Sequence, residues 1–269
     1  MADTLILVLI DGLGLQSACE AMGYMNALCE ARLARLHPVR SELPSLSRPL
    51  YECILTGARP VHSGIVDNAV VRLSTQQSVF HLAANAGLRT AAAAYYFISE
   101  LYNESPYNAV SHRFQDDTNK PIQHGCFYDN DSYPDDHLLL DAEYLRRRHD
   151  PHFLLIHPMN VDDAGHREGG HSPHYRNTVR RLDSLLSLYM PAWLEQGYQV
   201  MVTSDHGVNG DCTHGGTLPQ ERDVPLFVAG DRFNLDCMES PDQTMLCGLA
   251  CDILGIEGHG KPTLPGFLR

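Results

Sequence analysis

Short apolar runs alternate with longer amphipathic stretches along the chain. The first run, 5–10, is apolar at every position and ends in Asp11-Gly12, a pattern typical of a strand buried on both faces. Similar runs predict further strands at 89–94, 152–157, 199–204 and 225–229. Strands of this kind occur mainly in parallel sheets that are covered by helices.

Amphipathic patterns between these runs predict helices at 48–56, 76–86, 174–196 and 244–254. Pro191 is expected to bend or end the longest of them. Strands alternating with helices indicate an α/β fold: a doubly wound, mostly parallel central sheet with helices on both faces. We predict a single domain over residues 1–269 with a loop-rich excursion at about 99–136, where periodicity is weak.

The composition favours a folded protein with an acidic surface. The 269 residues carry a formal net charge of -13, and 43% of them are hydrophobic. This balance argues against a nucleic-acid polymer or an anionic membrane as partner, although bound divalent cations would let an acidic pocket accept an anionic substrate. Because no signal-peptide pattern, CxxC pair or apolar run of ~20 residues occurs, we expect a cytoplasmic protein with free thiols.

Side chains suited to metal ions follow three of the predicted strands. They are Asp11 after the first strand, Asp162 and His166 after the strand 152–157, and Asp205 and His206 after the strand 199–204. Ligands of open α/β sheets bind beyond the carboxyl ends of the strands, so these groups are expected to converge at one edge. Carboxylates and imidazoles suit Zn²⁺, with Mn²⁺ or Fe as alternatives.

Each of these motifs also has a plainer interpretation. Asp162 and His166 can meet one ion if the segment turns at Gly165, or they can belong to an ordinary polar loop. Burying Asp205 without a partner is costly, which favours a metal, yet Asp205 can also cap a helix with His206 in solvent.

Ser47 directly precedes the predicted helix 48–56. Free N–H groups and the positive end of the dipole at a helix start favour an alkoxide or a phosphoryl oxygen there. The same position also suits a serine that only caps the helix.

Taken together, the motifs resemble the alkaline phosphatase superfamily, and most closely its nucleotide pyrophosphatase/phosphodiesterase branch. The resemblance runs through nearly the whole chain in order. The matching segments are Asp11-Gly12, the nucleophile segment 44–49 with Leu55-Thr56-Gly57, the segment 64–68, the D-x-x-G-H pattern at 162–166, S-D-H-G at 204–207 and H-G-G at 214–216.

The resemblance implies two divalent metal ions, most naturally Zn²⁺. One is implied to be held by Asp162, His166 and His214, and the other by Asp11, Asp205 and His206, with Ser47 as a further ligand and the nucleophile. Asn68 and the backbone N–H of Arg48 are implied to bind phosphoryl oxygens. The Arg48 side chain either points at the substrate or covers the helix surface.

The implied activity is metal-dependent hydrolysis of a small-molecule phosphate ester through a phosphoseryl intermediate, as in a phosphodiesterase or nucleotide pyrophosphatase. Three departures concern the substrate. Leu50-Tyr51 stands where the branch has Asn-His, only seven residues separate His206 from His214 where the branch has a large insertion, and His62-Ser63-Gly64 replaces Ser-His-Gly. A phosphomonoesterase or phosphonate hydrolase, and a degenerate protein that only binds phosphoesters, are therefore alternatives, and the sequence leaves the oligomeric state open.

Overall fold

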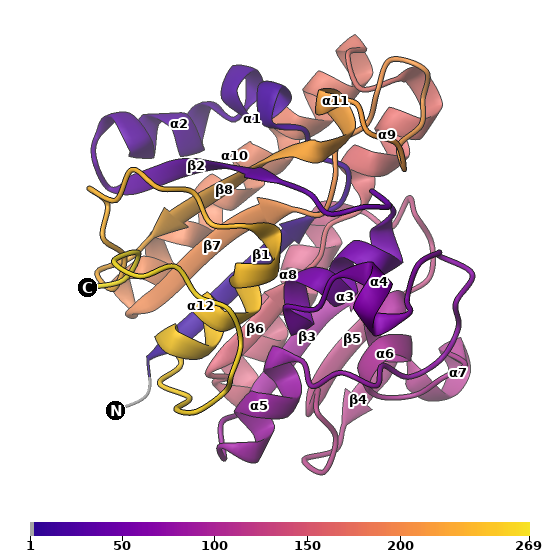
Figure 1. Ribbon diagram of the computed structural model, residues 1–269, viewed down its shortest axis with the longest axis vertical. Helices are drawn as coiled ribbons and strands as arrows, with labels where there is room; N and C mark the ends of the chain where they lie inside the picture. Colours follow the sequence, from indigo (N-terminus) through magenta and orange to yellow (C-terminus); the bar gives the residue numbers. More distant parts are fainter. Residues whose placement is uncertain (1–2) are drawn as a thin grey trace.

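An eight-stranded sheet forms the middle layer of the computed structural model, which describes residues 3–269 (Figure 1). The strand order is β2-β8-β7-β1-β6-β3-β5-β4. The strands are β1 (Thr4–Ile10), β2 (Ala34–Arg40), β3 (Thr90–Tyr95), β4 (Phe114–Asp116), β5 (His124–Tyr128), β6 (Phe153–Ile156), β7 (Tyr198–Ser204) and β8 (Asp223–Ala229). Neighbours from β7 to β5 pair in parallel, whereas β8 and β2 at one edge and β4 at the other join by antiparallel pairing.

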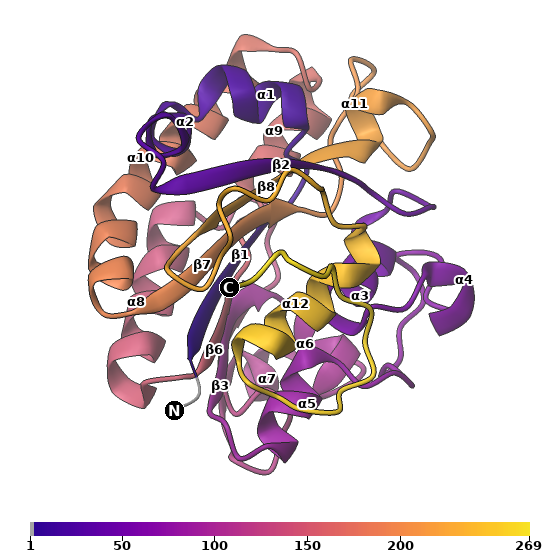
Figure 2. The same cartoon turned by 60° about the vertical axis from the view of Figure 1, so that its left-hand side comes forward.

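Helices cover both faces of the sheet, which confirms the predicted fold class (Figure 2). On one face lie α1 (Leu15–Ala21), α2 (Gly23–Glu30), α8 (Asp135–His149), α9 (Asn160–Glu168) and α10 (Pro173–Glu195). On the other face lie α3 (Ser47–Thr56), α5 (Val79–Asn85), α6 (Phe97–Tyr102) and α12 (Leu246–Ile253). The short helices α4 (Pro60–Ser63), α7 (Ala109–His112), α11 (Pro219–Arg222) and η1 (Gln243–Met245) lie in the connections.

The central strand β1 shows why its sequence forms a buried strand. Leu5, Leu7 and Leu9 pack into the core beneath α3, α5 and α12, and Ile6, Val8 and Ile10 pack into the core beneath α1, α8 and α10. Alternate residues thus bury against opposite layers, and each contributes roughly 1.5–3 kcal/mol by leaving water. This burial fixes the strand whose end presents Asp11.

The structure departs from the predicted elements at several places, and the helices α1, α2, α8 and α9 were not predicted. The strand β2 was not predicted, because Pro38 interrupts its pattern; an edge strand tolerates a proline. The helix α10 continues through Pro191 to Glu195, so an end at Pro191 is wrong. The excursion predicted at 99–136 is only partly loop, since it contains α7, β4 and the fully buried β5.

Two further features concern the cysteines and the helices of residues 3–269. All eight cysteines are free thiols, and Cys247 and Cys251 are buried on α12 as their spacing suggests. Within this range, no helix is both long enough and apolar enough to cross a membrane.

Candidate active site

The predicted metal ligands gather beyond the carboxyl ends of the central strands. Asp11 follows β1, and Asp205 and His206 follow β7. Asp162 lies on α9, the helix that follows β6 in the chain. His206 Nε2 lies 3.1 Å from Asp205 Oδ2 and 3.6 Å from Asp11 Oδ1. On the other side of the cluster, His166 Nε2 lies 3.3 Å from Asp162 Oδ2 and 3.1 Å from His214 Nε2.

Two groups of donor atoms form within this cluster. The donor atoms of Asp162, His166 and His214 lie within 4.8 Å of one another, and so do those of Asp11, Asp162 and His206. Asp162 belongs to both groups. Its Oδ1 also lies 3.8 Å from His214 Nε2. Two adjacent cation positions are therefore available, but the second groups Asp162 with Asp11 and His206, where the resemblance implies Asp205.

A regular helix, and not a glycine turn, brings Asp162 and His166 together. Both lie on α9 four residues apart, so one turn places them on the same face. The predicted turn at Gly165 is wrong. A Cβ at Gly165 would lie 2.8 Å from Val208 Cγ2, so this glycine lets α9 pack closely against the loop after β7.

Gly12 allows the loop after β1 to approach Asp162. It has φ +74°, a conformation that L side chains adopt at a cost, and a Cβ there would lie 2.7 Å from Asp162 Oδ1 and 2.8 Å from Asp162 Cα. Its N–H donates to Asp205 Oδ1 at 3.2 Å. A glycine is therefore needed where the β1 loop meets the other two carboxylates.

The three histidines present their Nε2 atoms to the cluster. Each Nδ1 lies near a backbone carbonyl oxygen: His166 at 2.9 Å from Cys212, His206 at 3.2 Å from Gly207, and His214 at 2.8 Å from Ser45. An Nδ1–H that donates to a carbonyl leaves the Nε2 lone pair free, which is how metal-binding histidines are commonly oriented.

Several carboxylate oxygens of the cluster have no hydrogen-bond partner in residues 3–269. They are Asp11 Oδ1, Asp162 Oδ1 and Asp205 Oδ2, and their side chains are almost completely buried. Burying such an oxygen without a partner costs ~1–3 kcal/mol, and more when it is charged. Divalent cations would satisfy all three, so the donor set fits the two metal ions.

The electrostatics of the carboxyl groups also favour cations. Burial, together with the charges of Asp205 and Asp162, raises the pKa of Asp11 well above its ordinary value. Burial and the charge of Asp162 raise the pKa of Asp205 in the same way. Positive charge placed here would relieve this repulsion and hold both groups as carboxylates.

Asp162 and His166 form the exception, because they pair with each other. Burial acts to raise the pKa of Asp162, but the hydrogen bond from His166 and the positive charge of that imidazole lower it. The same hydrogen bond raises the pKa of His166 to about 9. Burial lowers the pKa of His206 and of His214, so these two imidazoles stay neutral and able to bind a metal.

Ser47 is the first residue of α3 and points into the cluster. The N-cap position belongs to Leu46, which makes no side-chain cap hydrogen bond. Ser47 Oγ lies 3.1 Å from His206 Nε2, so its hydroxyl donates toward the ligand cluster. This placement differs from that of a serine that only caps the helix.

Asn68 and Arg48 lie beside Ser47 but interact with each other. The Arg48 N–H donates to Asn68 Oδ1 at 2.9 Å. The Arg48 side chain is buried, pairs with Glu100 at 2.6 Å and stacks on Phe97 at 3.8 Å from the ring centroid. In this conformation the guanidinium is engaged by Glu100 and Phe97. The role of Arg48 in substrate binding stays a prediction.

A pocket of about 140 Å³ opens over Ser47. Tyr95, Phe97 and Asp131 line it together with five of the predicted site residues, which are Ser47, Asn68, Asp162, His166 and His214. A second, open pocket of about 580 Å³ adjoins it and shares Tyr95 and Asp131. Asp131 was missed by the sequence analysis, because it lies in a polar loop with no recognisable pattern.

Two buried aromatic residues support the cluster from behind. The Tyr51 hydroxyl donates to Asp11 Oδ2, and the His157 ring packs edge-on against Tyr51 at 4.6 Å between centroids. The only sequence signal for Tyr51 was that it stands where the related branch has a histidine. Both positions would otherwise count as ordinary core residues.

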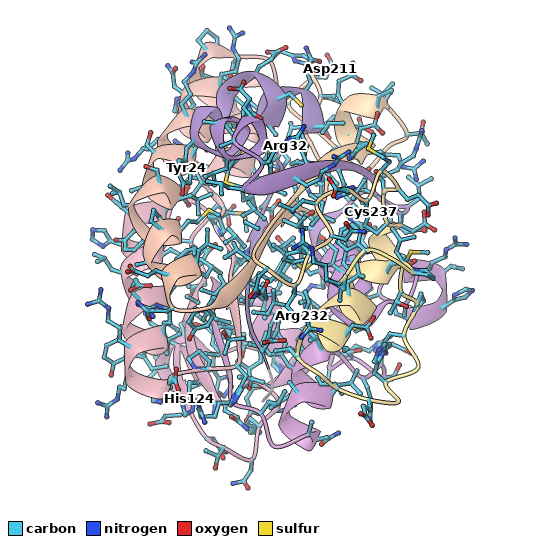
Figure 3. The ribbon with its side chains drawn as sticks, turned by 90° about the vertical axis from the view of Figure 1, so that its left-hand side faces the viewer. Tyr24, Arg32, His124, Asp211, Arg232 and Cys237 are labelled. Atoms are coloured by element: carbon cyan, nitrogen blue, oxygen red, sulfur yellow. The ribbon has the colours of Figure 1, made fainter. Side chains whose placement is uncertain are left out.

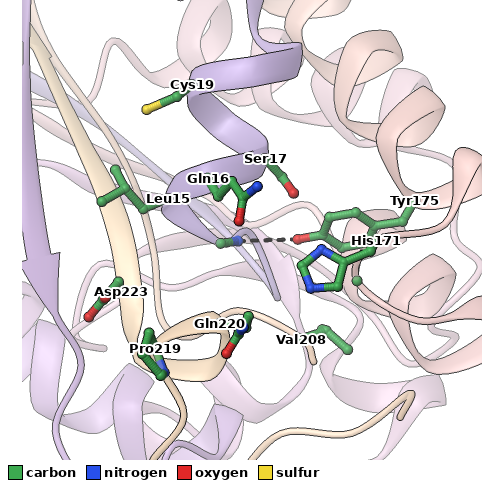
Figure 4. Close-up of a pocket in the computed structure, with 12 residues that line it drawn as sticks. Leu15, Gln16, Ser17, Cys19, His171, Tyr175, Val208, Pro219, Gln220 and Asp223 are labelled. Carbon is green, nitrogen blue, oxygen red and sulfur yellow. Dashed lines mark hydrogen bonds between the residues drawn. The ribbon is translucent and has the colours of Figure 1, made fainter. Parts of the chain in front are cut away.

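Tyr175 holds the β1 loop from the opposite side (Figure 4). Its hydroxyl donates to the Gly12 carbonyl at 2.6 Å and accepts from the Gly14 N–H at 3.1 Å. A separate cavity of about 330 Å³ lies here, and none of the predicted metal ligands lines it. Tyr175 therefore fixes, through these two hydrogen bonds, the position of the loop that carries Asp11.

Comparison with known proteins places the chain in a family. Residues 5–218 match the family described as type I phosphodiesterase / nucleotide pyrophosphatase. The chain therefore belongs to this family, and the resemblance to the alkaline phosphatase superfamily is confirmed. Family and fold together support a phosphodiesterase-type enzyme that acts on phosphoesters.

Solved structures share the fold at low sequence identity. Human ectonucleotide pyrophosphatase / phosphodiesterase 5 superposes with a TM-score of 0.75 at 13% identity, over 99% of this chain and 100% of that one. An inactive form of the murine protein in complex with AMP gives a TM-score of 0.72 at 13% identity, over the same shares of the two chains.

The curated relatives are transferases of ethanolamine phosphate. GPI ethanolamine phosphate transferase 2 from Debaryomyces hansenii is 23% identical over 87% of this chain and 27% of its own length. The catalytic subunit of the human enzyme is 21% identical over 85% of this chain and 23% of its own length. The chain thus spans about a quarter of the length of these relatives.

Proposed function

We propose that this protein cleaves phosphate diesters or nucleotide pyrophosphates with Ser47 as nucleophile, assisted by two divalent metal ions, most naturally Zn²⁺. The observation that carries the proposal is the position of Ser47 Oγ, 3.1 Å from His206 Nε2 and beside buried carboxylate oxygens that lack partners in residues 3–269. A structural serine would not need such a neighbourhood. Bound ions supply Lewis-acid stabilisation of the oxygens around phosphorus.

The position of each residue determines its proposed role in catalysis. Asp162, His166 and His214 would hold one ion. Asp11, Asp205 and Ser47, each within 3.6 Å of His206 Nε2, would hold the other together with His206. Ser47 Oγ attacks phosphorus, the alcohol leaves, and water then cleaves the phosphoseryl ester to regenerate the serine. The N-terminal end of α3 faces the charge that develops during attack.

Asn68 is suited to hold a phosphoryl oxygen. Its Oδ1 accepts the Arg48 N–H at 2.9 Å, which orients the amide so that Nδ2 is the atom left to donate into the pocket. Arg48 acts here through its backbone, and its side chain positions the start of α3 through Glu100. Asn68 thereby becomes the side-chain donor of the oxyanion site.

Kinetics on two model esters test the proposal. Metal-stripped enzyme is assayed with bis(p-nitrophenyl) phosphate and with p-nitrophenyl phosphate after Zn²⁺ or Mn²⁺ is restored. We expect a diester preference, loss of turnover in Ser47→Ala, and retention of a substantial part of it in Ser47→Thr, which keeps the hydroxyl. Ser184→Ala, at an exposed position of α10, serves as control.

The alternatives give different results in the same assay. A monoester preference would indicate a phosphomonoesterase, and cleavage of only a carbon–phosphorus bond would indicate a phosphonate hydrolase. Tight phosphoester binding without turnover would indicate a degenerate binding protein. Full activity in Ser47→Ala would overturn the nucleophile assignment itself.

We propose transfer of ethanolamine phosphate as a second candidate function, because acidic side chains adjoin the pocket over Ser47. Asp131 lines both pockets, and Asp129 and Asp163 line the outer one, although Arg167 pairs with Asp163 at 3.0 Å. This charge suits a substrate that carries an ammonium group, as the names of the transferase relatives suggest.

Diesters with and without the ammonium group distinguish the two candidates. We expect p-nitrophenyl phosphoethanolamine to be preferred over an ethyl analogue, and Asp131→Asn to reduce that preference. The phosphoryl product is then identified in the presence of an added alcohol. A product joined to the alcohol favours transfer, and a product released only to water favours hydrolysis.

A further inference from the structure

A second cluster of metal-binding side chains lies away from the active site, where the edge strand β4 meets the end of α8. Its members are Asp116, His124 and His149, whose donor atoms lie within 4.8 Å of one another. Figure 3 shows His124 at the opposite end of the molecule from Asp211, which lies in the loop that leads to His214. The proposed catalytic ions do not involve this cluster.

Three separate elements position these side chains. Asp116 and His124 are directly opposite each other in the antiparallel β4–β5 pair, and His124 Nδ1 lies 2.9 Å from Asp116 Oδ1. His149 is the last residue of α8, and its ring stacks on that of His124 with centroids 3.7 Å apart and planes at 15°. The pair His206 and His214 in the active site stacks in the same way, at 3.7 Å and 17°.

The charge of the cluster suits a cation. The carboxylate of Asp116 and the negative end of the α8 dipole both favour positive charge here, while Arg148 next to His149 opposes it.

A cavity provides access to the cluster. It measures about 310 Å³ and is lined by Asp116 and His149, with Asp141 and Arg148 beside them. An ion can enter by this route, and water from the cavity can complete a four-coordinate site with three protein ligands. Ligands around Zn²⁺ lie ~3.3 Å apart, so the partly exposed His149 ring has to turn out of its stack on His124 before both imidazoles direct a nitrogen at one ion.

We propose that Asp116, His124 and His149 form a peripheral transition-metal site, suited to Zn²⁺, that ties the end of α8 to the edge strand β4. Two imidazoles and one carboxylate are a donor set that Zn²⁺ commonly takes. An ordinary ion pair between Asp116 and His124 would not need the third side chain. The proposal is independent of the catalytic metals.

The number of Zn²⁺ ions bound per chain tests this site. Wild type, His149→Ala and the control His137→Ala, an exposed histidine of the same helix, are dialysed against Zn²⁺ alone and analysed by elemental analysis. We expect His149→Ala to bind one ion fewer than the other two and to keep its hydrolytic activity. Equal stoichiometry and affinity in His149→Ala and His137→Ala would overturn the proposal.

Two further variants make the result independent of folding and of the catalytic site. Asp116→Asn changes an exposed side chain, and we expect it to weaken the same single site at least ~10-fold. In the double variant Asp162→Asn, His214→Ala, which removes catalytic ligands, the peripheral ion should still bind and should again be lost with His149→Ala. Zn²⁺ binding to this double variant that His149→Ala leaves unchanged would refute the site, whatever the outcome for the active site.

Discussion

The Tyr51 hydroxyl is expected to set the metal affinity of the site without touching a metal. It donates to Asp11 Oδ2, and both side chains are fully buried. Burial and the charge of Asp11 raise the pKa of Tyr51 well above its ordinary value, so the phenol remains a donor. Tyr51→Phe removes this one oxygen and retains the ring that packs against His157.

The expected size of the effect follows from the hydrogen bond that is lost. A hydrogen bond to a charged group contributes ~1.5–3 kcal/mol, and ~1.36 kcal/mol corresponds to one factor of ten. We therefore expect Tyr51→Phe to weaken Zn²⁺ binding by roughly 10- to 100-fold, which matches the usual effect of a residue that orients a metal ligand. Turnover should fall at limiting Zn²⁺ and recover largely at saturating Zn²⁺.

Competition with a chromophoric chelator measures this affinity. Tyr102→Phe is the matched control, because Tyr102 is also buried and donates to the carboxylate of Glu52 at 2.9 Å, outside the predicted ligand set. It should cost stability and leave Zn²⁺ affinity unchanged. If Tyr51→Phe binds Zn²⁺ as tightly as Tyr102→Phe does, the inferred support of Asp11 by Tyr51 is refuted.

Two further predictions concern the same cluster. In metal-free protein, the pKa values of Asp11 and Asp205 are raised, and that of His166 is raised to about 9. A group whose pKa is raised in the folded state loses its stabilising effect as the pH rises through that pKa. Without metal, the free energy of unfolding measured in urea should therefore fall between about pH 7 and about pH 9. With Zn²⁺ it should hold or rise, because the ligands of the ion must be deprotonated. Greater metal-free stability at the higher pH would contradict this prediction. Gly12→Ala should lower the free energy of unfolding by about 1–2 kcal/mol through its positive φ alone. It should also lower kcat/KM, because the new Cβ displaces Asp162. Wild-type kcat/KM in a folded Gly12→Ala variant would show that the close approach of Gly12 to Asp162 is unnecessary.

The sequence was informative where one pattern reports one local structure. The strand that ends at Asp11 is apolar at every position, and such a run has few alternatives to a buried parallel strand. The segments around Asp162 and Asp205 are short motifs tied to strand ends, so their approach to one edge followed from the fold class alone.

The roles of residues that depend on a partner distant in the chain could not be predicted from the sequence. Nothing near Tyr51 or Tyr175 in the chain indicates that their hydroxyls bind Asp11 and the Gly12 carbonyl. The segment that forms α9 is polar on average and contains a glycine, which is why Gly165 was interpreted as a turn. Its true role, close packing against Val208, becomes visible only in three dimensions.

The most direct test of the account is whether Ser47 becomes phosphorylated during turnover. Metal-loaded wild type is mixed with a rapidly cleaved diester and quenched in acid, and the peptide that contains Ser47 is analysed by mass spectrometry. We predict a phosphoryl-ester adduct on Ser47 whose amount rises and decays with turnover and which is absent from Ser47→Ala. Turnover by wild type with no adduct on this peptide at any quench time, together with activity in Ser47→Ala, would contradict the central claim.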